Sequence, residues 1–179
     1  MIFTPTSLDD SYLVDLERLA DDRGFFARTF CQTEFANLGL EKSVAQCNTS
    51  FNQSRGTVRG MHFQKAPHSE AKLVRCISGS IFDVIIDLRK DSKTFLQSYS
   101  CELTSANRTA LYIPEGFAHG FQTLEDSSEV FYQMFDFFSP NDAIGIRWDD
   151  PTFSISWPLP VTKISDKDKN YPDFKELLL

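Results

Sequence analysis

Short segments of β-type residues, separated by turn residues, recur along most of this chain and restrict its fold more than any other feature. No alternation of strand and helix interrupts them, so a parallel sheet built from βαβ units is not expected. Such spacing is typical of an antiparallel sandwich or barrel, and a jelly roll over residues 1–179 is the predicted architecture. The expected strands are 72–77, 81–88, 95–103, 109–114, 119–124 and 129–138.

Two local predictions can be compared directly with a structure. The strands at 72–77 and 81–88 flank a Ser-Gly-Ser turn, which predicts that they form a hairpin. One helix is expected at 33–40, with Thr33 as its N-cap and Gly39 near its end. In the strand 81–88, alternation separates a face with Phe82, Val84 and Ile86 from one with Asp83, Ile85 and Asp87.

Composition narrows the class of protein. Hydrophobic residues make up 41% and charged residues 24% of the chain, as in an ordinary globular protein. The 17 Phe need a wide interior, a ligand cavity or a subunit interface. A formal charge of −7 argues against nucleic acid as a partner, because duplex binding depends on Lys and Arg releasing counterions. A small anionic ligand, which needs only a few local cations, is compatible with it.

The cysteines and the N-terminal residues indicate the cellular compartment in which the protein is expected. Cys31, Cys47, Cys76 and Cys101 show neither CxxC pairing nor zinc-ribbon spacing. No secretory signal is visible in the first residues, and no apolar stretch is long enough to cross a membrane. We therefore expect free thiols, no membrane contact and a cytoplasmic protein.

Two histidines stand in patterns that suggest a metal site. Small β-barrels of the cupin type carry Gly-x5-His-x-His on one strand and Pro-x-Gly-x-x-His on a later one. This chain matches the frame with Gly56, His62 and the Pro114-x-Gly116-x-x-His119 run, but Gln64 replaces the second histidine. Two imidazoles and an amide are a poor ligand set for zinc or iron. His68 and Glu70 belong to what reads as a polar loop, so no metal is expected.

Proton chemistry is the alternative for His62. On a regular strand His62 shares its face with Gly60 and Gln64, and Lys72 starts the next strand. If the intervening loop folds back, His62 and Lys72 point into one cavity. There the cation keeps the imidazole neutral enough to act as a base and stabilises a developing enolate. Spacing alone leaves the alternative open that His62 is a core residue and Lys72 a solvated strand end.

The motifs RGMHFQ (59–64), KLVRCISGSIFDVIIDLR (72–89) and IPEGFAHG (113–120) resemble those of the dTDP-4-dehydrorhamnose 3,5-epimerase family. The likeness extends from DDRGFF (21–26) through IRWDDP (146–151) to ISDKD (164–168). The resemblance implies a cupin-type jelly-roll barrel with a few short helices. It also implies an epimerase that uses neither metal nor organic cofactor and forms homodimers through its N-terminal strands.

The resemblance assigns four catalytic residues. His62 is the base and Asp168 the carboxylate that orients it, because a carboxylate on one ring nitrogen fixes the tautomer and raises the basicity of the other. Tyr132 is the acid on the opposite face of the sugar, and Lys72 is the active-site lysine. Without the resemblance, Asp168 reads as a charge in a solvated tail and Tyr132 as a core aromatic residue.

Further residues match positions that bind the sugar or its nucleotide. Asp83 either orients His119 or has a structural role. Arg59 and Arg23 suit a diphosphate because guanidinium offers a bidentate fork. The substrate-binding residues expected from the resemblance are Arg23, Gln46, Asn48, Arg59, His119 and Lys167.

The implied reaction inverts C3 and C5 of a nucleotide-linked 4-keto-6-deoxyhexose, most directly dTDP-4-dehydro-6-deoxyglucose to dTDP-4-dehydrorhamnose. Four positions depart from the family pattern, namely Arg28, Cys47, Phe138 and Ala143. They lie toward the expected nucleotide end, so they bear on the base and the sugar. The alternatives are an epimerase acting on one centre or on a GDP- or CDP-linked sugar, a 3,4-ketoisomerase, which Tyr132 disfavours, and a nonenzymatic binding module.

Overall fold

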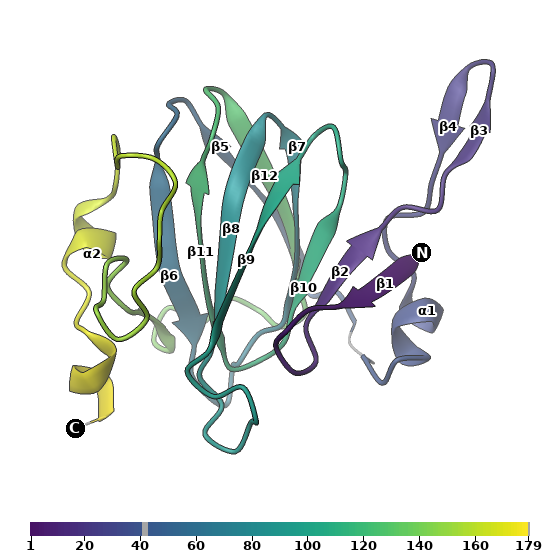
Figure 1. The fold of residues 1–179 in the computed structure, drawn as a ribbon. Coiled ribbons are helices and arrows are strands. Elements are labelled where there is room, and N and C mark those ends of the chain that lie inside the picture. Colours follow the sequence, from purple (N-terminus) through teal and green to yellow (C-terminus); the bar gives the residue numbers. More distant parts are fainter. Residues whose placement is uncertain (41–42, 179) are drawn as a thin grey trace.

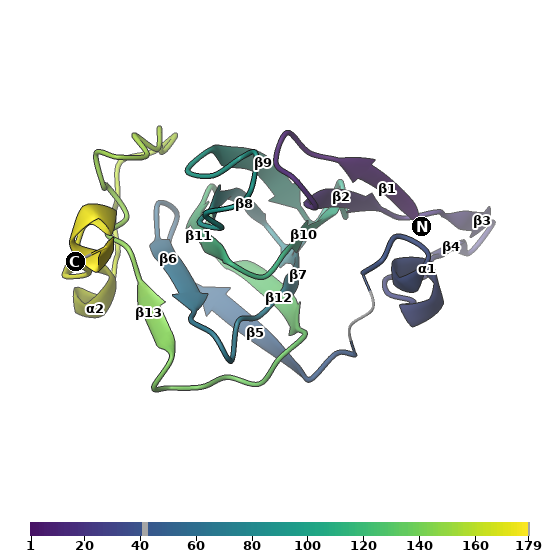
Figure 2. The ribbon, with the colours of Figure 1, turned by 90° about the horizontal axis from the view of Figure 1, so that it is seen from below.

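The computed structural model describes residues 1–40 and 43–178, in which two antiparallel sheets face each other (Figure 1, Figure 2). Along the described chain, the first sheet has the order β1 (Ile2–Pro5), β2 (Tyr12–Asp15), β10 (Ala110–Ile113), β7 (Lys72–Ser78), β12 (Ser128–Met134) and β5 (Gln46–Asn52). The second has the order β13 (Ala143–Gly145), β6 (Val58–Gln64), β11 (Phe117–Thr123), β8 (Ser80–Asp87) and β9 (Ser98–Thr104). The helical segments are short: α1 (Gln32–Ala36), α2 (Asp166–Lys169) and the 3₁₀ helix η1 (Phe174–Leu178). The predicted all-β jelly-roll class is confirmed.

Three apolar clusters hold the layers together. The cluster between the sheets includes Val74, Ile85 and Leu111, all buried. A second cluster lies under α1, where Phe35 is fully buried against Tyr112 and other aromatic rings. The third is formed where the chain after β13 covers the outer face of the second sheet, and its buried members include Met61, Ile86, Ile146 and Phe174. Packing of the terminal segments on the outside of the barrel thus uses many of the aromatic residues.

Strand β8 shows why both faces of this barrel read as apolar. Ile81 and Ile85 belong to the cluster between the sheets, whereas Phe82, Val84 and Ile86 pack in the cluster under the C-terminal segment. The predicted division of this strand into two faces is confirmed. A strand covered on both sides buries side chains of both parities.

The predicted hairpin between residues 72–77 and 81–88 is wrong. Strand β7 pairs with β10 and β12 in the first sheet, whereas β8 pairs with β9 and β11 in the second. Gly79 alone separates them, with φ of +71°, and a Cβ there would lie 2.5 Å from the Ser128 Oγ. The chain therefore turns a corner between the sheets at a position that glycine tolerates best.

The early helix is shorter than expected. It begins at Gln32 after the N-cap Cys31, which makes no side-chain capping bond, so the prediction of Thr33 as the cap is wrong. The helix ends at Ala36, and Gly39, with φ of +73°, lies in the turn that follows. Burial of Phe35, rather than a capping bond, holds this segment in place.

A bulge in β6 changes which side chains enter the barrel. His119 pairs with His62, but Phe121 pairs with Arg59, so one more residue lies on β6 than on β11 across this interval. Gly60 has φ of +130° there, and a Cβ on it would lie 2.5 Å from the Gly120 Cα. Strict alternation predicted that Gly60 shares a face with His62, and this prediction is wrong. Because of the bulge, the side chains of Arg59 and His62 line the same cavity instead.

The short hairpin formed by β3 (Leu19–Asp21) and β4 (Gly24–Phe26) projects away from the barrel (Figure 1). All residues of both strands are exposed, including Leu19 at 66% and Phe26 at 71%. Within the described residues, no helix combines the length and apolar character that a membrane crossing requires.

The close approach of β6 to β11 predicts a large effect of Gly60→Ala on stability. Because the added methyl group would meet backbone atoms, we expect the free energy of unfolding to fall by about 2–3 kcal/mol, measured by chemical denaturation. Gly24→Ala is the matched control: Gly24 has φ of +128°, but no described atom lies within 4 Å of the position that its added methyl group would take. Equal losses in the two variants would contradict the packing argument.

Candidate active site

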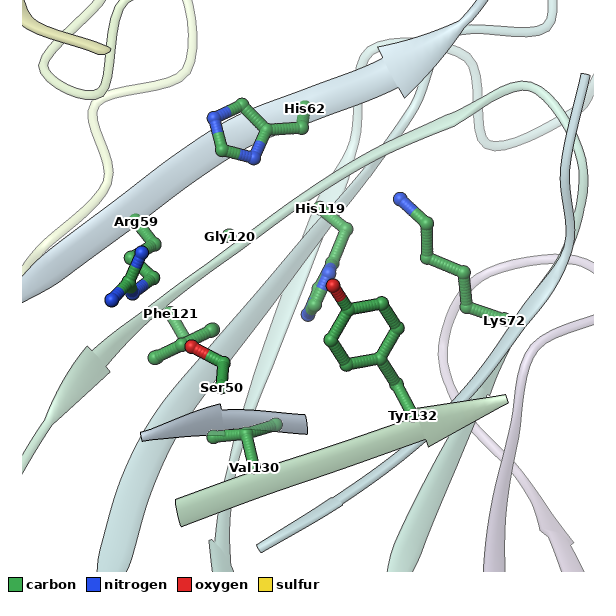
Figure 3. Close-up of a pocket in the computed structure, with 9 residues that line it drawn as sticks. All are labelled: Ser50, Arg59, His62, Lys72, His119, Gly120, Phe121, Val130 and Tyr132. Atoms are coloured by element: carbon green, nitrogen blue, oxygen red, sulfur yellow. The ribbon is translucent and has the colours of Figure 1, made fainter. Parts of the chain in front are cut away.

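Three of the four predicted catalytic residues, His62, Lys72 and Tyr132, line a cavity between the two sheets (Figure 3), and Asp168 lines a second cavity beside it. The first cavity has a volume of about 170 Å³, and the second, of about 300 Å³, adjoins it through shared lining residues. Both are lined by Arg59 and His62 from β6, Lys72 from β7 and Tyr132 from β12. The sequence prediction that His62 and Lys72 face one cavity is thus met by the structure.

His62 is held by the C-terminal segment. Its Nε2 lies 2.7 Å from the Asp168 Oδ1, and the other oxygen of Asp168 accepts the Gly60 backbone N–H at 3.2 Å. Burial raises the pKa of Asp168, but the hydrogen bonds from His62 and Gly60 outweigh it, so the pKa lies below its ordinary value. An ionised Asp168 places the imidazole proton on Nε2 and leaves Nδ1 free to accept a proton from the cavity.

A second histidine has the same arrangement. His119 Nε2 lies 2.9 Å and 3.1 Å from the two oxygens of Asp83, on the neighbouring strand β8. Asp83 is completely buried inside the barrel, and 11% of the His119 side chain is exposed. Asp83 therefore orients His119, because both of its oxygens lie within hydrogen-bond distance of the His119 Nε2.

Lys72 also has a carboxylate partner. Its Nζ lies 2.8 Å from the Oε1 of Glu70, and both side chains are almost fully buried. The sequence predicted Glu70 in a polar loop, and the structure has it in the loop two positions before β7, but buried and lining the second cavity. The i and i+2 spacing of Glu70 and Lys72 in an extended segment is the signal that indicates a shared face.

Tyr132 faces His62 from the opposite sheet (Figure 3). Burial raises the pKa of the Tyr132 phenol, although the charge of Arg59 acts in the other direction. The hydroxyl is therefore protonated at neutral pH and can donate. Arg59 itself donates from Nε to the Asn52 Oδ1 at 2.7 Å, which leaves its terminal nitrogens available to an anion.

The other predicted binding residues lie at different distances from the cavities. Lys167 lines the second cavity next to Asp168. Gln46 and Asn48 bond to each other, and Gln46 accepts the Phe138 backbone N–H at 2.9 Å, so this pair supports the rim without lining either cavity. Arg23 lies in the projecting hairpin, with 85% of its side chain exposed, and pairs with Asp21. The structure does not bring Arg23 to the cavities of its own chain.

Tyr171 is a lining residue that the sequence reading missed. Its ring contacts the His62 ring edge to face at 5.9 Å between centroids. Gly145, opposite His62 in β13, makes room for it, since a Cβ there would clash with the Tyr171 ring. Tyr171 therefore braces the imidazole from the side of the C-terminal segment. An aromatic residue three positions after Asp168 was the available signal.

The four departures from the family pattern separate into two groups. Phe138 and Ala143 line the second cavity, where they can influence what binds. Cys47 is exposed on the outer face of β5, and Arg28 pairs with Glu34 at 2.8 Å. Cys47 and Arg28 are not among the lining residues of either cavity.

Gln64 stands where cupins carry a metal-binding histidine, and its side-chain amide is hydrogen-bonded to backbone groups. Its Nε2 donates to the carbonyls of His68 and Phe137, and its Oε1 accepts the Ser139 N–H at 2.7 Å. Across the described residues, no three His, Cys, Asp or Glu side chains gather as a metal site would require.

The fold and the site together define a jelly-roll barrel of the cupin type with a cavity between its sheets that histidine, lysine and tyrosine side chains line. The family model of dTDP-4-dehydrorhamnose 3,5-epimerase matches residues 5–176. A curated dTDP-4-dehydrorhamnose 3,5-epimerase from Methanothermobacter thermautotrophicus is 42% identical over 97% of this chain and 95% of its own length.

Solved structures agree with this match. The dTDP-4-dehydrorhamnose 3,5-epimerase of Elizabethkingia anophelis superposes with a TM-score of 0.95 at 36% identity, covering 98% of this chain and 97% of that one. The enzyme of Bacillus anthracis, solved with TDP and PPi bound, gives 0.93 at 38% identity, covering 97% and 99%. The chain belongs to the dTDP-4-dehydrorhamnose 3,5-epimerase family, and it is a carbohydrate epimerase of the isomerase class.

The Asp168 environment predicts a pH-dependent contribution to stability. Because its folded pKa is depressed, the contribution is present above the ordinary value of 3.8 and is lost as pH falls through the folded value. Asp168→Asn should lower the free energy of unfolding by about 1–3 kcal/mol at neutral pH. The difference in the free energy of unfolding between the variant and the native protein should become smaller below pH 3.8. Urea unfolding at a series of pH values measures it. A difference that does not change with pH would contradict an ionised Asp168.

Proposed function

We propose that this protein converts dTDP-4-dehydro-6-deoxyglucose to dTDP-4-dehydrorhamnose by inverting C3 and C5. The observation that carries the proposal is the placement of His62 and Tyr132 on opposite sheets, with a cavity between them (Figure 3). Inversion of a carbon needs a base on one face and an acid on the other. Family membership supports the same reaction, and we propose that residues 1–179 act as one catalytic unit.

The chemistry follows from the ketone at C4, which acidifies the protons on C3 and C5. The Nδ1 of His62 removes one of these protons, and the electron pair moves onto the C4 oxygen as an enolate. The ammonium of Lys72 stabilises this oxygen, and His119 adds a polar neighbour in the same cavity. Tyr132 then delivers a proton to the opposite face of the carbon.

Each inversion leaves His62 protonated and Tyr132 deprotonated, so both groups must exchange with water before the next one. No metal or organic cofactor takes part in this proposal. Arg59, Lys167 and Phe138 line the cavities and suit the diphosphate and base of a nucleotide sugar. The Bacillus anthracis neighbour with TDP and PPi supports this choice of ligand.

We further propose that the protein works as a homodimer in the cytoplasm. The projecting hairpin β3–β4 supports the dimer, because its exposed Leu19 and Phe26 and its outlying Arg23 suit contact with a second copy. Arg23 would then serve the partner's active site. Four free cysteines fit a reducing compartment.

The reaction is tested in deuterated water with dTDP-4-dehydro-6-deoxyglucose in the presence of EDTA. The native protein should place deuterium at C3 and C5 with inversion, read by NMR. His62→Ala should abolish exchange, because no proton leaves the sugar. Tyr132→Phe should exchange protons while largely keeping the configuration, with inversion slower by about 10²–10⁴-fold.

Other labelling patterns would change the proposal in defined ways. Deuterium at one carbon only would make this an epimerase of a single centre, and activity restricted to a GDP- or CDP-linked sugar would change the substrate. Inversion by Tyr132→Phe at a near-native rate would remove Tyr132 as the acid. Activity lost with EDTA and restored by zinc, iron or manganese would overturn the metal-free mechanism.

The dimer is tested by subunit complementation. Light scattering should give twice the chain mass, and Arg23→Ala should raise KM about tenfold or more because a phosphate contact is lost. In a dimer of one Arg23→Ala and one His62→Ala subunit, one of the two sites has both an intact His62 and an intact Arg23 from the partner. Mixing the two variants should therefore give a fraction of sites with the native KM. A monomer in solution, or no gain on mixing, would contradict the proposal.

A further inference from the structure

Glu70 is a buried carboxylate with an unusual lack of partners. Its side chain is 4% exposed, and its Oε1 lies 2.8 Å from the Lys72 Nζ. The Oε2 is also buried, and no described group makes a hydrogen bond to it. Within the described chain, the ion pair with Lys72 is therefore the one polar contact of this carboxylate.

Two other buried carboxylates are tied to the backbone as well as to side chains, whereas the buried Asp83 bonds, among the described residues, only to His119, which also lines the cavity. Asp168 accepts the Gly60 N–H in addition to His62. Asp87 accepts the Arg89 N–H together with the hydroxyls of Ser92 and Thr94. Because burying a carboxylate is costly unless it is well bonded, a group held only by Lys72 is poorly explained as a support for the fold.

We propose that Glu70 is a positioning residue that aims the ammonium of Lys72 into the cavity. This inference rests on the proposed function for its catalytic part. The ammonium has three N–H donors, and Glu70 takes one of them on the wall of the second cavity. The other two are left for the enolate oxygen beside Tyr132, and a four-carbon side chain is restrained where it would otherwise rotate.

Kinetics of a double-mutant cycle test the role. Glu70→Leu keeps much of the volume but removes the acceptor, so kcat should fall about 10–100-fold with little change in KM. Glu70→Gln keeps an acceptor oxygen and should lose less than about tenfold. In the Lys72→Met background, Glu70→Leu should cause almost no further loss, because its effect passes through Lys72.

Two controls accompany the cycle. Glu102→Leu, at an exposed carboxylate of β9, should leave kcat unchanged. Each variant should bind dTDP with native affinity, which shows that it is folded. Three outcomes would overturn the proposal. They are a near-native kcat in Glu70→Leu, a loss in kcat that multiplies with the loss caused by Lys72→Met, and equal losses in kcat for the Leu and Gln variants.

A second measurement does not depend on the reaction. In protein labelled with ¹⁵N-lysine, the ammonium signal of Lys72, identified by its absence in Lys72→Met, should show restricted motion and slow exchange. Glu70→Leu should abolish both properties, and Glu70→Gln should retain them in part. A mobile ammonium in the native protein would overturn the inference even if the epimerase proposal holds. A fixed ammonium in a protein without epimerase activity would place the failure in the proposed function instead.

Discussion

The hydrogen bond between His62 and Asp168 joins two parts of the chain that are 106 residues apart, and the site depends on it. Asp168 reaches His62 only because the C-terminal segment is packed on the outside of the second sheet through Ile146, Phe174 and their neighbours. Ser165 caps the short helix that carries Asp168 by accepting its backbone N–H. The apolar contacts outside the barrel thus determine which nitrogen of the imidazole is free inside it.

A common rule governs the donors that face the cavity. His62, His119 and Lys72 each have a buried carboxylate behind them, namely Asp168, Asp83 and Glu70. Arg59 differs, since it is held by the neutral amide of Asn52. A carboxylate holds each of these donors in one direction, and in a buried position an unpaired charge would be expensive. The result is a set of groups whose orientations are decided before a ligand arrives.

The sequence predicted the all-β class and the two faces of β8, because hydrophobic alternation and turn residues are local signals. For His62 and Lys72 spacing left two alternatives open, and the structure places both residues on one cavity. The prediction failed where a single residue changes the path of the chain. Gly79 was read as a hairpin turn but is a corner between sheets, and the bulge at Gly60 brings Arg59 to the face of His62. Glu70 and Tyr171 stand at spacings that hint at a shared face with Lys72 and Asp168, but long-range packing decides that they line the second cavity, and spacing does not show this packing. The roles of Asp168 and Tyr132 came from family resemblance alone.

The placement of His62 and Tyr132 on separate sheets has a consequence for distant residues. The gap between these two groups is set by how far apart the sheets stand, and the sheets rest on the side chains of Val74, Ile85 and Leu111 beneath the cavity. This apolar layer acts as a spacer for the sugar ring. A smaller side chain there would let the sheets approach, and a larger one would separate them. Under the proposed mechanism, the fidelity of inversion would therefore depend on the packing of the core as well as on the chemistry of the site.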